Sequence, residues 1–460
     1  MFCAFFILLP FVASSQGTIT GTVSIDGKAL PGVNVSIKAA LIFVSSDASG
    51  NYEMENIPVG THTLEATFVG MQPMRKSVTI KDKASIRINF ELKEDNSLEE
   101  VVITGTLKAV TRSESAVPVE IYSTAFFKKN PTANIFEGLQ TVNGVRPQFN
   151  CNICNTGDIH INGLEGPYTL VLIDGMPIVS GLSTVYGLSG IPNSMIDRIE
   201  IVKGPASSLY GSEAVGGLIN IITKNPKNAA LFTADAFSTS WGEVNTDVSL
   251  KVNPSDKISI MTGINYFNYS NRIDNNGDNF TDVTLQDRVS IFQKYNVNRS
   301  SGKLLSIMAR YFYEDRWGGE MNWNKTDRGS NRVYGESIYT NRWELIGSYE
   351  LPLNEKMLLN FSYTNHDQDS FYGVTPYLAQ QRIGFTQLTW DKKKGRHDML
   401  FGAAFRYQFY NDNTPATIAS DVSTIPGVFA QDEIRLSQKH HLLLGARYDY
   451  NSRHGSIFTP

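Results

Sequence analysis

Apolar and polar residues alternate along the second half of this chain. From about residue 228 onward, runs of roughly ten residues place apolar or aromatic side chains on one face and polar side chains on the other. Ile264 and Tyr266, for example, alternate with Gly263 and Asn265. This period of two predicts antiparallel β-strands, about ten of them between residues 227 and 460.

The connections between these strands alternate in length. Short turns are predicted at 253–257, 299–303, 352–356, 391–396 and 437–441, and longer polar loops at 268–286, 314–339, 365–380 and 411–425. A membrane β-barrel has short turns on one side and long loops on the other. A soluble β-sandwich explains the alternating faces equally well, but not this regular rhythm.

The first 93 residues have a different texture. Residues 1–15 form an apolar stretch that ends in small residues, which predicts a signal peptide. This stretch lacks a basic start, and the alternative is a buried strand or helix. Residues 16–93 show short alternating strands separated by Gly and Pro turns such as Asp26-Gly27, which predicts an immunoglobulin-like β-sandwich.

Between these two regions, residues 107–226 predict a small α/β unit of tight hairpins. The apolar run Leu170–Ile173 is stopped by Asp174-Gly175, a dipeptide that tolerates positive φ. Further on, Gly216 and Gly217 leave little room for side chains, which suits close packing of the backbone against another surface.

Three segments of this unit carry a resemblance to a known family. They are LIDGMP (172–177), IDRIEIVKGP (196–205) and SLYGSEAVGGLINIITK (208–224), and the unit resembles the plug domain of TonB-dependent outer-membrane receptors. Residues 16–93 are similar to the carboxypeptidase regulatory-like domain that precedes such receptors in Bacteroidetes-type bacteria. No peptidase residues are present there.

The resemblance implies a mainly β chain with three folded parts. They are an N-terminal immunoglobulin-like β-sandwich, an α/β plug domain (107–226) and an antiparallel transmembrane β-barrel (227–460). Because the family barrel has about 22 strands and about ten fit here, we expect a C-terminally incomplete barrel.

The resemblance also implies a function. Such receptors lie in the outer membrane of Gram-negative bacteria and take up scarce nutrients with energy supplied by the TonB–ExbB–ExbD complex. We expect a metal chelate as ligand: a ferric siderophore, haem or cobalamin. The alternatives are a glycan importer of the same class and a surface adhesin or structural β-protein without transport. A free-diffusion porin does not account for the plug.

Residues 94–106 are predicted to be a linker that contains a TonB box. The resemblance falls on Glu100, Val101, Val102, Ile103 and Thr104. A short β-branched segment held by weak contacts can pair through its backbone with a strand of a partner protein. From these residues alone, an ordinary linker strand is the alternative.

Within the plug, three charged residues are candidates for polar contacts with the barrel wall. They are Arg198, Glu200 and Lys203. Polar contacts between plug and wall separate more readily than apolar packing would. A plug that must be remodelled during transport requires such separable contacts.

Composition and motifs exclude several other classes. The formal net charge is −4, so no polyanion partner is indicated, and we expect no nucleic-acid binding. No nucleophile elbow, P-loop or HExxH motif is present. We therefore expect no enzymatic activity and no required cofactor.

The pair Cys151 and Cys154, followed by His160, leaves two hypotheses open. A disulfide suits an oxidising periplasm, while thiolates and an imidazole together suit Cu, Zn or Fe, including a haem ligand set.

Two stretches of the predicted loops are candidates for ligand chemistry. Asp274, Asn276, Asp278 and Asp282 place oxygens at alternating positions around a glycine, which predicts a Ca²⁺ loop, with a plain polar loop as the alternative. The segment Glu314–Trp323 offers aromatic rings and both charges to a large chelate.

Overall fold

The computed structural model describes residues 16–25, 27–68, 71, 73–93, 101–112, 115–149, 157–178, 187–437 and 440–460. The chain divides into two compact units, residues 1–101 with 111–113 and residues 102–110 with 114–460. Among the described residues, no helix is long and apolar enough to cross a membrane.

The first unit contains a β-sandwich with its own core. In one sheet β1 pairs with β2, β5, β8 and β9, and the other sheet has the order β4-β3-β6-β7. Ile19 and Val23, which the alternating pattern of β1 places on one face, are completely buried, as are Val35 and Leu64 from the facing sheet. The elements are β1 (Gln16–Ile25), β2 (Lys28–Ala29), β3 (Asn34–Ile37), η1 (Lys38–Ala40), β4 (Ile42–Ser45), β5 (Asn51–Pro58), β6 (Gly60–Thr67), β7 (Met74–Ile80), β8 (Ser85–Arg87) and β9 (Phe90–Glu91).

The plug, at the start of the second unit, is built on a five-stranded sheet of order β12-β17-β18-β15-β16. β15 and β18 run parallel, and the other neighbours run antiparallel. The strands are β10 (Val101–Val102), β11 (Val110–Thr111), β12 (Glu120–Ser123), β13 (Val145–Phe149), β14 (Gly157–Ile161), β15 (Thr169–Ile173), β16 (Met176–Ile178), β17 (Ile196–Val202) and β18 (Gly217–Thr223). The helices are α1 (Thr124–Lys128), α2 (Ile135–Gly138), η4 (Leu139–Thr141), η5 (Gly166–Tyr168), η6 (Asn193–Met195), α4 (Ser207–Tyr210) and η7 (Ser212–Ala214).

Backbone geometry explains why glycine occupies two positions of the plug. The hairpin between β15 and β16 turns at Asp174 and Gly175 with φ of 48° and 80°, which confirms the predicted turn. Gly217 has φ of 141°, and a Cβ atom there would lie 2.3 Å from the carbonyl oxygen of Val202. A side chain at this position would therefore force apart the adjacent strands β17 and β18.

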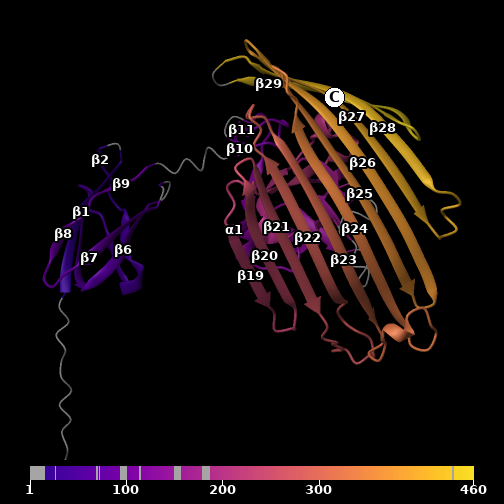
Figure 1. The fold of residues 1–460 in the computed structure, drawn as a ribbon, viewed down its shortest axis with the longest axis horizontal. Helices are drawn as coiled ribbons and strands as arrows, with labels where there is room; N and C mark the ends of the chain where they lie inside the picture. The colour runs from indigo at the N-terminus through magenta and orange to yellow at the C-terminus, as the bar shows by residue number, and fades with distance from the viewer. Residues whose placement is uncertain are drawn as a thin grey trace, which may run out of the picture. The chain divides into compact units, whose positions relative to one another are not determined.

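A twelve-stranded antiparallel sheet, here called the wall, completes the second unit and curves around the plug (Figure 1). Each strand pairs with the next in chain order, and the structure has twelve strands where about ten were expected. They are β19 (Phe232–Ser238), β20 (Val244–Ser255), β21 (Ile258–Tyr269), β22 (Leu285–Val297), β23 (Leu305–Gly319), β24 (Gly335–Glu350), β25 (Lys356–Tyr372), β26 (Thr375–Lys394), β27 (His397–Asp412), β28 (Asp421–Arg435), β29 (His441–Asn451) and β30 (Gly455–Thr459), with η8 (Lys325–Asp327) between β23 and β24.

The two faces of the wall have the reverse of the polarity of a water-soluble sheet. On β23, Tyr311 and Tyr313 are exposed on the outer face, while Arg310 on the inner face is buried. On β21, Ile264 is exposed and Asn265 is buried. An apolar outer face with a polar interior is the arrangement of a barrel that is surrounded by lipid.

The connections predicted between the strands are confirmed with one exception, but two further connections at the long-loop end, 239–243 and 452–454, are short. The turn predicted at 437–441 lies partly outside the described residues. Residues 256–257, 298–304, 351–355 and 395–396 form short turns at one end of the wall, and 270–284, 320–334 and 413–420 form longer loops at the other. The loop predicted at 365–380 is wrong, because β25 and β26 continue to a two-residue turn at Gly373-Val374 with unbroken pairing up to Tyr372 and Thr375. Polar residues on both faces of this hairpin hide the strand pattern in the sequence.

Candidate functional site

The segment that resembles the TonB box lies against the plug sheet, and its Thr104 is completely buried. The backbone N–H groups of Ile103 and Thr104 donate to Oε2 of Glu200 at 3.0 and 2.9 Å, and the hydroxyl of Thr104 donates to the same oxygen. One carboxylate oxygen therefore receives three donors from two consecutive residues of the segment.

Arg198, two residues before Glu200 on β17, orients the Glu200 carboxylate. The side chain of Glu200 is completely buried, and its Oε1 accepts hydrogen bonds from Nε and Nη2 of Arg198 at 2.8 and 2.7 Å. A buried carboxylate is tolerated only when it is paired and hydrogen-bonded. Because Arg198 pairs with Oε1, the other carboxylate oxygen, Oε2, can accept the hydrogen bonds from Ile103 and Thr104.

Two more plug side chains hold Thr104. Asn220 of β18 donates to Oγ1 of Thr104 at 2.9 Å, and its Oδ1 accepts from the N–H of Gly175 at 3.0 Å. The hydroxyl of Tyr210, at the end of α4, donates to the carbonyl oxygen of Thr104 at 2.9 Å. Burial, and then the nearby charge of Glu200, raise the pKa of Tyr210, so the phenol stays protonated and remains a donor.

Apolar packing adds to this polar anchorage. Val102 is completely buried in a cluster with Val119, Leu172 and Leu218 of the plug. Residues 102–107, here called the box segment, are therefore docked on the plug more firmly than a segment held by weak contacts would be.

Directly after the box segment, Lys108 binds the short-turn end of the wall. Its ammonium group contacts Asp391 at 3.0 Å and Asp398, and it donates to the carbonyl oxygen of Met399 at 3.0 Å. Lys108 is buried, so these three wall acceptors compensate its desolvation.

A second contact of plug and wall joins Lys294 of β22 to the β15–β16 turn. Its Nζ lies 2.9 Å from Oδ2 of Asp174 and 2.6 Å from Oγ1 of Thr223. Thr223 in turn donates to Asp174 through its N–H and its hydroxyl. The turn beside Gly175 is thus fixed to the wall by one cation.

Wall arginines also bind plug backbone and side chains. Arg310 donates to the carbonyl oxygen of Gly187 at 2.7 Å and to that of Ser189, and Arg447 donates to that of Leu209 at 2.9 Å. Further contacts are made by Arg288 to Ala133 and by Arg406 to Glu213. The sequence analysis did not identify these arginines as contacts of the plug. The only feature that marks them in the sequence is that each is an isolated basic residue at an inward-facing position of a strand.

The predicted contacts of Arg198, Glu200 and Lys203 with the barrel wall need correction. Arg198 binds Glu200, Glu200 binds the box segment, and Nζ of Lys203 lies 2.6 Å from Oε2 of Glu120 on the neighbouring plug strand. These contacts lie inside the plug because β17 pairs with β12 and β18 in the plug sheet.

Several candidate residues lie at or beyond the limits of the description. Glu100, Cys151 and Cys154 lie outside the described residues. His160 is half-buried on β14, opposite Arg146 of β13. The disulfide and metal-ligand hypotheses for this group stay predictions.

The predicted Ca²⁺ loop is held by its own hydrogen bonds. Asp274 accepts backbone N–H groups of Gly277, Asp278 and Asn279, and Asp282 accepts that of Asn275, at 2.7–3.2 Å. Within the described ranges, no group of three or more His, Cys, Asp or Glu side chains is placed to hold a metal ion. The Ca²⁺ hypothesis, which includes Asn276, stays a prediction.

The ligand-gripping role expected for Glu314–Trp323 does not fit the exposure of its side chains. Glu314, Arg316 and Trp323 are at most 1 % exposed. Phe280 and Tyr334, which lie on the two longest loops with ring centroids 6.3 Å apart, are 41 % and 44 % exposed. These rings are better placed to meet a ligand at the long-loop end.

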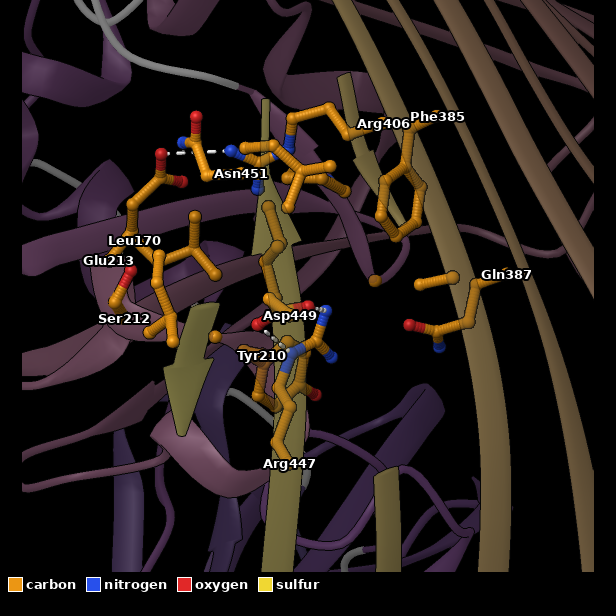
Figure 2. Close-up of a pocket in the computed structure, with 17 residues that line it drawn as sticks. Leu170, Tyr210, Ser212, Glu213, Phe385, Gln387, Arg406, Arg447, Asp449 and Asn451 are labelled. Atoms are coloured by element: carbon orange, nitrogen blue, oxygen red, sulfur yellow. Dashed lines mark hydrogen bonds and ion pairs between the residues drawn. The ribbon is translucent and has the colours of Figure 1, made fainter. Parts of the chain in front are cut away.

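Two cavities separate the plug from the wall, and residues of the box segment line one of them. The middle cavity, of about 100 Å³, is shown in Figure 2, where Glu213 of the plug points to Arg406 of the wall and Arg447 pairs with Asp449. The short-turn cavity, of about 290 Å³, is lined by the wall strands β22–β25, by the β15–β16 turn and by Ile103 and Leu107 of the box segment. Gly175 and Tyr210 line both cavities.

An α/β domain held by polar side chains inside a curved antiparallel sheet with an apolar outer face defines the class of plugged β-barrels. Residues 111–218 match the family described as TonB-dependent Receptor Plug Domain, and residues 19–103 match the CarboxypepD_reg-like domain. The chain therefore carries the plug of the TonB-dependent receptors and, before it, the carboxypeptidase regulatory-like domain, which confirms the resemblance of the sequence motifs.

Relatives of known name support this identification. The iron-regulated outer membrane virulence protein of Vibrio cholerae is 24 % identical over 390 residues, which cover 79 % of this chain and 56 % of that protein. The chain thus spans little more than half the length of the curated relatives it matches.

Solved structures share the fold at low identity. FpvA of Pseudomonas aeruginosa bound to heterologous pyoverdines matches with a TM-score of 0.60 at 14 % identity, over 80 % of this chain and 56 % of that one. The ferric enterobactin receptor PfeA of the same organism matches with a TM-score of 0.58 at 17 % identity, over 78 % and 60 %. The siderophore receptor PirA of P. aeruginosa gives 0.56 at 18 % identity, over 74 % and 57 %.

Proposed function

We propose that this chain belongs to an outer-membrane receptor that takes up a metal chelate with energy from the inner membrane. The ligand binds at the long-loop end, the box segment is released at the short-turn end, and a partner then pulls it so that the plug opens a path. The matched family is one of receptors, and the proposed role is transport without enzymatic chemistry.

The observation that carries this proposal is the docking of the box segment. Thr104 is bonded at its N–H, its hydroxyl and its carbonyl to three different plug side chains. A pull on this segment must therefore act on the plug sheet itself. A passive pore or an adhesin has no need of such a coupling.

The proposed partner is TonB, working with ExbB and ExbD. Once released, the β-branched residues Val102–Thr104 offer a free backbone to a partner strand, and main-chain hydrogen bonds supply most of the affinity.

Among metal chelates, a ferric siderophore is the first choice, ahead of haem and cobalamin. The support comes from relatives that are named as iron-regulated or as siderophore receptors. The exposed rings of Phe280 and Tyr334 offer flat apolar surface to such a ligand.

The test separates binding from uptake. In the full-length protein, deletion of residues 99–105 should leave binding of the chelate intact and abolish uptake. A strain without the gene should lose growth on one ferric siderophore, haem or cobalamin source and regain it on complementation. Normal growth on every such source would refute import and favour an adhesin, and uptake that survives the deletion would refute the assignment of the box.

A further inference from the structure

Near its long-loop end, the inner face of the wall carries three linked oxygen groups. The hydroxyl oxygens of Tyr377 and Tyr410 are 2.9 Å apart, and the hydroxyl of Tyr410 donates to Oδ2 of Asp412 at 2.7 Å. The three residues, here called the mouth cluster, come from the neighbouring strands β26 and β27. Two phenols and a carboxylate are thus in direct contact.

The alternation of side chains along both strands places the mouth cluster on the inner face of the wall. On β26, Tyr377 lies on the same face as Gln381, which is buried. On β27, Tyr410 and Asp412 lie on the same face as the buried Ala404. All three residues of the cluster are themselves half-buried, so the cluster is within reach of a solute in the lumen.

The surroundings of the mouth cluster add negative charge. Glu336 of β24 lies opposite Tyr372 of β25, whose phenol interacts electrostatically with both Glu336 and the cluster. Among the described residues, no Lys or Arg forms an ion pair with Glu336 or Asp412. By contrast, Asp369 on the outer face of β25 pairs with Arg328 at 2.9 Å. The inner face at this level therefore carries negative charge that no side chain balances, and such a surface attracts a cation.

The oxygens of the mouth cluster are donors that a ferric ion prefers. Fe³⁺ is a hard cation that binds anionic oxygens, and two phenolates with one carboxylate balance its charge. In an octahedron with metal–oxygen distances of about 2.0 Å, neighbouring oxygens are about 2.8 Å apart. The spacings of 2.9 and 2.7 Å in the cluster match this edge length. Among the described residues, His, Cys, Asp and Glu side chains alone form no group that could hold a metal, so the phenolates are essential donors.

We propose that the mouth cluster binds a ferric ion. On binding, Tyr377 and Tyr410 each release a proton to the solvent, both phenolate oxygens bond to the metal, and Oδ2 of Asp412 becomes the third ligand. The two phenolates and the carboxylate then neutralise the charge of Fe³⁺. Thr414 orients the carboxylate, because its N–H and its hydroxyl donate to Oδ1 of Asp412 at 2.7 and 2.6 Å.

These three ligands leave coordination positions of the metal free for another molecule. The mouth cluster therefore suits a ferric ion that is carried by a weak chelator, whereas a chelator that fills every position excludes the phenolates. Capture of such iron adds a second form of cargo to the ferric siderophore. As a step of uptake this capture rests on the proposed function, but binding of the metal by the wall does not.

The test is ferric-ion binding to the purified full-length protein in detergent. Ferric nitrilotriacetate supplies the iron, because this chelator leaves coordination positions of the metal open. A phenolate bound to Fe³⁺ gives a charge-transfer absorption band in the visible range, which a site made of carboxylates alone lacks. The unaltered protein should show this band, and the band should saturate at one ferric ion per chain.

Substitutions then assign the band to the mouth cluster. Tyr377→Phe and Tyr410→Phe each remove one phenolate, and each should reduce the band and weaken iron binding at least about tenfold. Asp412→Asn should weaken binding but leave a band, because both phenolates remain. Tyr339→Phe is the matched control, since this tyrosine lies on the outer face of β24 with its ring against Arg328, and it should change neither the band nor the affinity.

Two results would overturn the proposal. One is the absence of the band in the unaltered protein, and the other is a band of full strength in both Tyr377→Phe and Tyr410→Phe. Either result concerns metal binding by the purified protein and leaves uptake of a siderophore, and its requirement for residues 99–105, unaffected. A failure of this inference is therefore distinct from a failure of the proposed function.

Discussion

Replacement of Glu200 by Gln tests the docking of the box segment most directly. The carboxylate accepts three donors from Ile103 and Thr104 on one oxygen and two from Arg198 on the other. A glutamine has one acceptor oxygen and one NH₂ group, so it satisfies Arg198 or the box segment but not both.

The magnitude follows from the hydrogen bonds that are lost. A hydrogen bond to a charged group contributes about 1.5–3 kcal/mol, and part of the loss is recovered by rearrangement of Arg198, which is partly exposed. We expect the free energy of local opening of the box segment to fall by about 2–3 kcal/mol, which raises its open population about 30- to 160-fold.

Native-state hydrogen exchange with mass spectrometry measures this opening. In Glu200→Gln, the amides of Ile103 and Thr104 should exchange faster by that factor, while amides in the centre of the wall keep their protection. The control is Glu120→Gln, the same substitution on the neighbouring strand, where the carboxylate pairs with Lys203 and not with the box segment. Unchanged exchange at Ile103 and Thr104 in Glu200→Gln would refute the docking.

Three further outcomes follow from the described contacts. Tyr210→Phe should raise exchange in the box segment about fivefold, because one neutral hydrogen bond to Thr104 is lost, and an unchanged rate would show that this bond does not hold the segment. In the isolated sandwich, Lys38 and then Arg75 lower the pKa of Glu65 below its ordinary 4.5, so thermal stability should be constant above about pH 5 and fall as the pH drops below 4.5, with a weaker fall in Glu65→Gln; equal slopes would contradict this. Asp274→Ala removes the acceptor of three backbone N–H groups and should speed proteolysis within 270–284 about fivefold, and the Ca²⁺ hypothesis adds that calcium slows cleavage of the unaltered loop but not of this variant; no effect of calcium would reject that hypothesis.

Local patterns in the sequence were sufficient to predict the plug turn and the strands of the wall. Asp174-Gly175 adopts the positive φ values that its residue types favour, and Ile264 faces outward as the period of two requires. Where both faces of a strand are polar, as around the turn at Gly373-Val374, this period disappears and the sequence predicts a loop in place of the paired strands β25 and β26.

The contacts of the candidate site were beyond prediction from the sequence. Glu200 lies 96 positions from Thr104 along the chain. Nothing in the residue pattern of β17 indicates whether its carboxylate contacts the box segment or the barrel wall. The same holds for Arg310, whose partner carbonyls at Gly187 and Ser189 become available only when the plug is folded inside the wall. Such pairings depend on tertiary structure and not on local preference.

In the proposed mechanism, Lys108 limits how far the partner can draw the chain. Its ammonium group is tied to Asp391, Asp398 and Met399 immediately behind the box segment. The six residues 102–107, fully stretched, reach about 20 Å. Over this distance, a pulling force breaks the hydrogen bonds between the box segment and the plug one after another. Only when the segment is fully extended does the force act on the contacts of Lys108 with Asp391, Asp398 and Met399, and through them on the short-turn end of the wall.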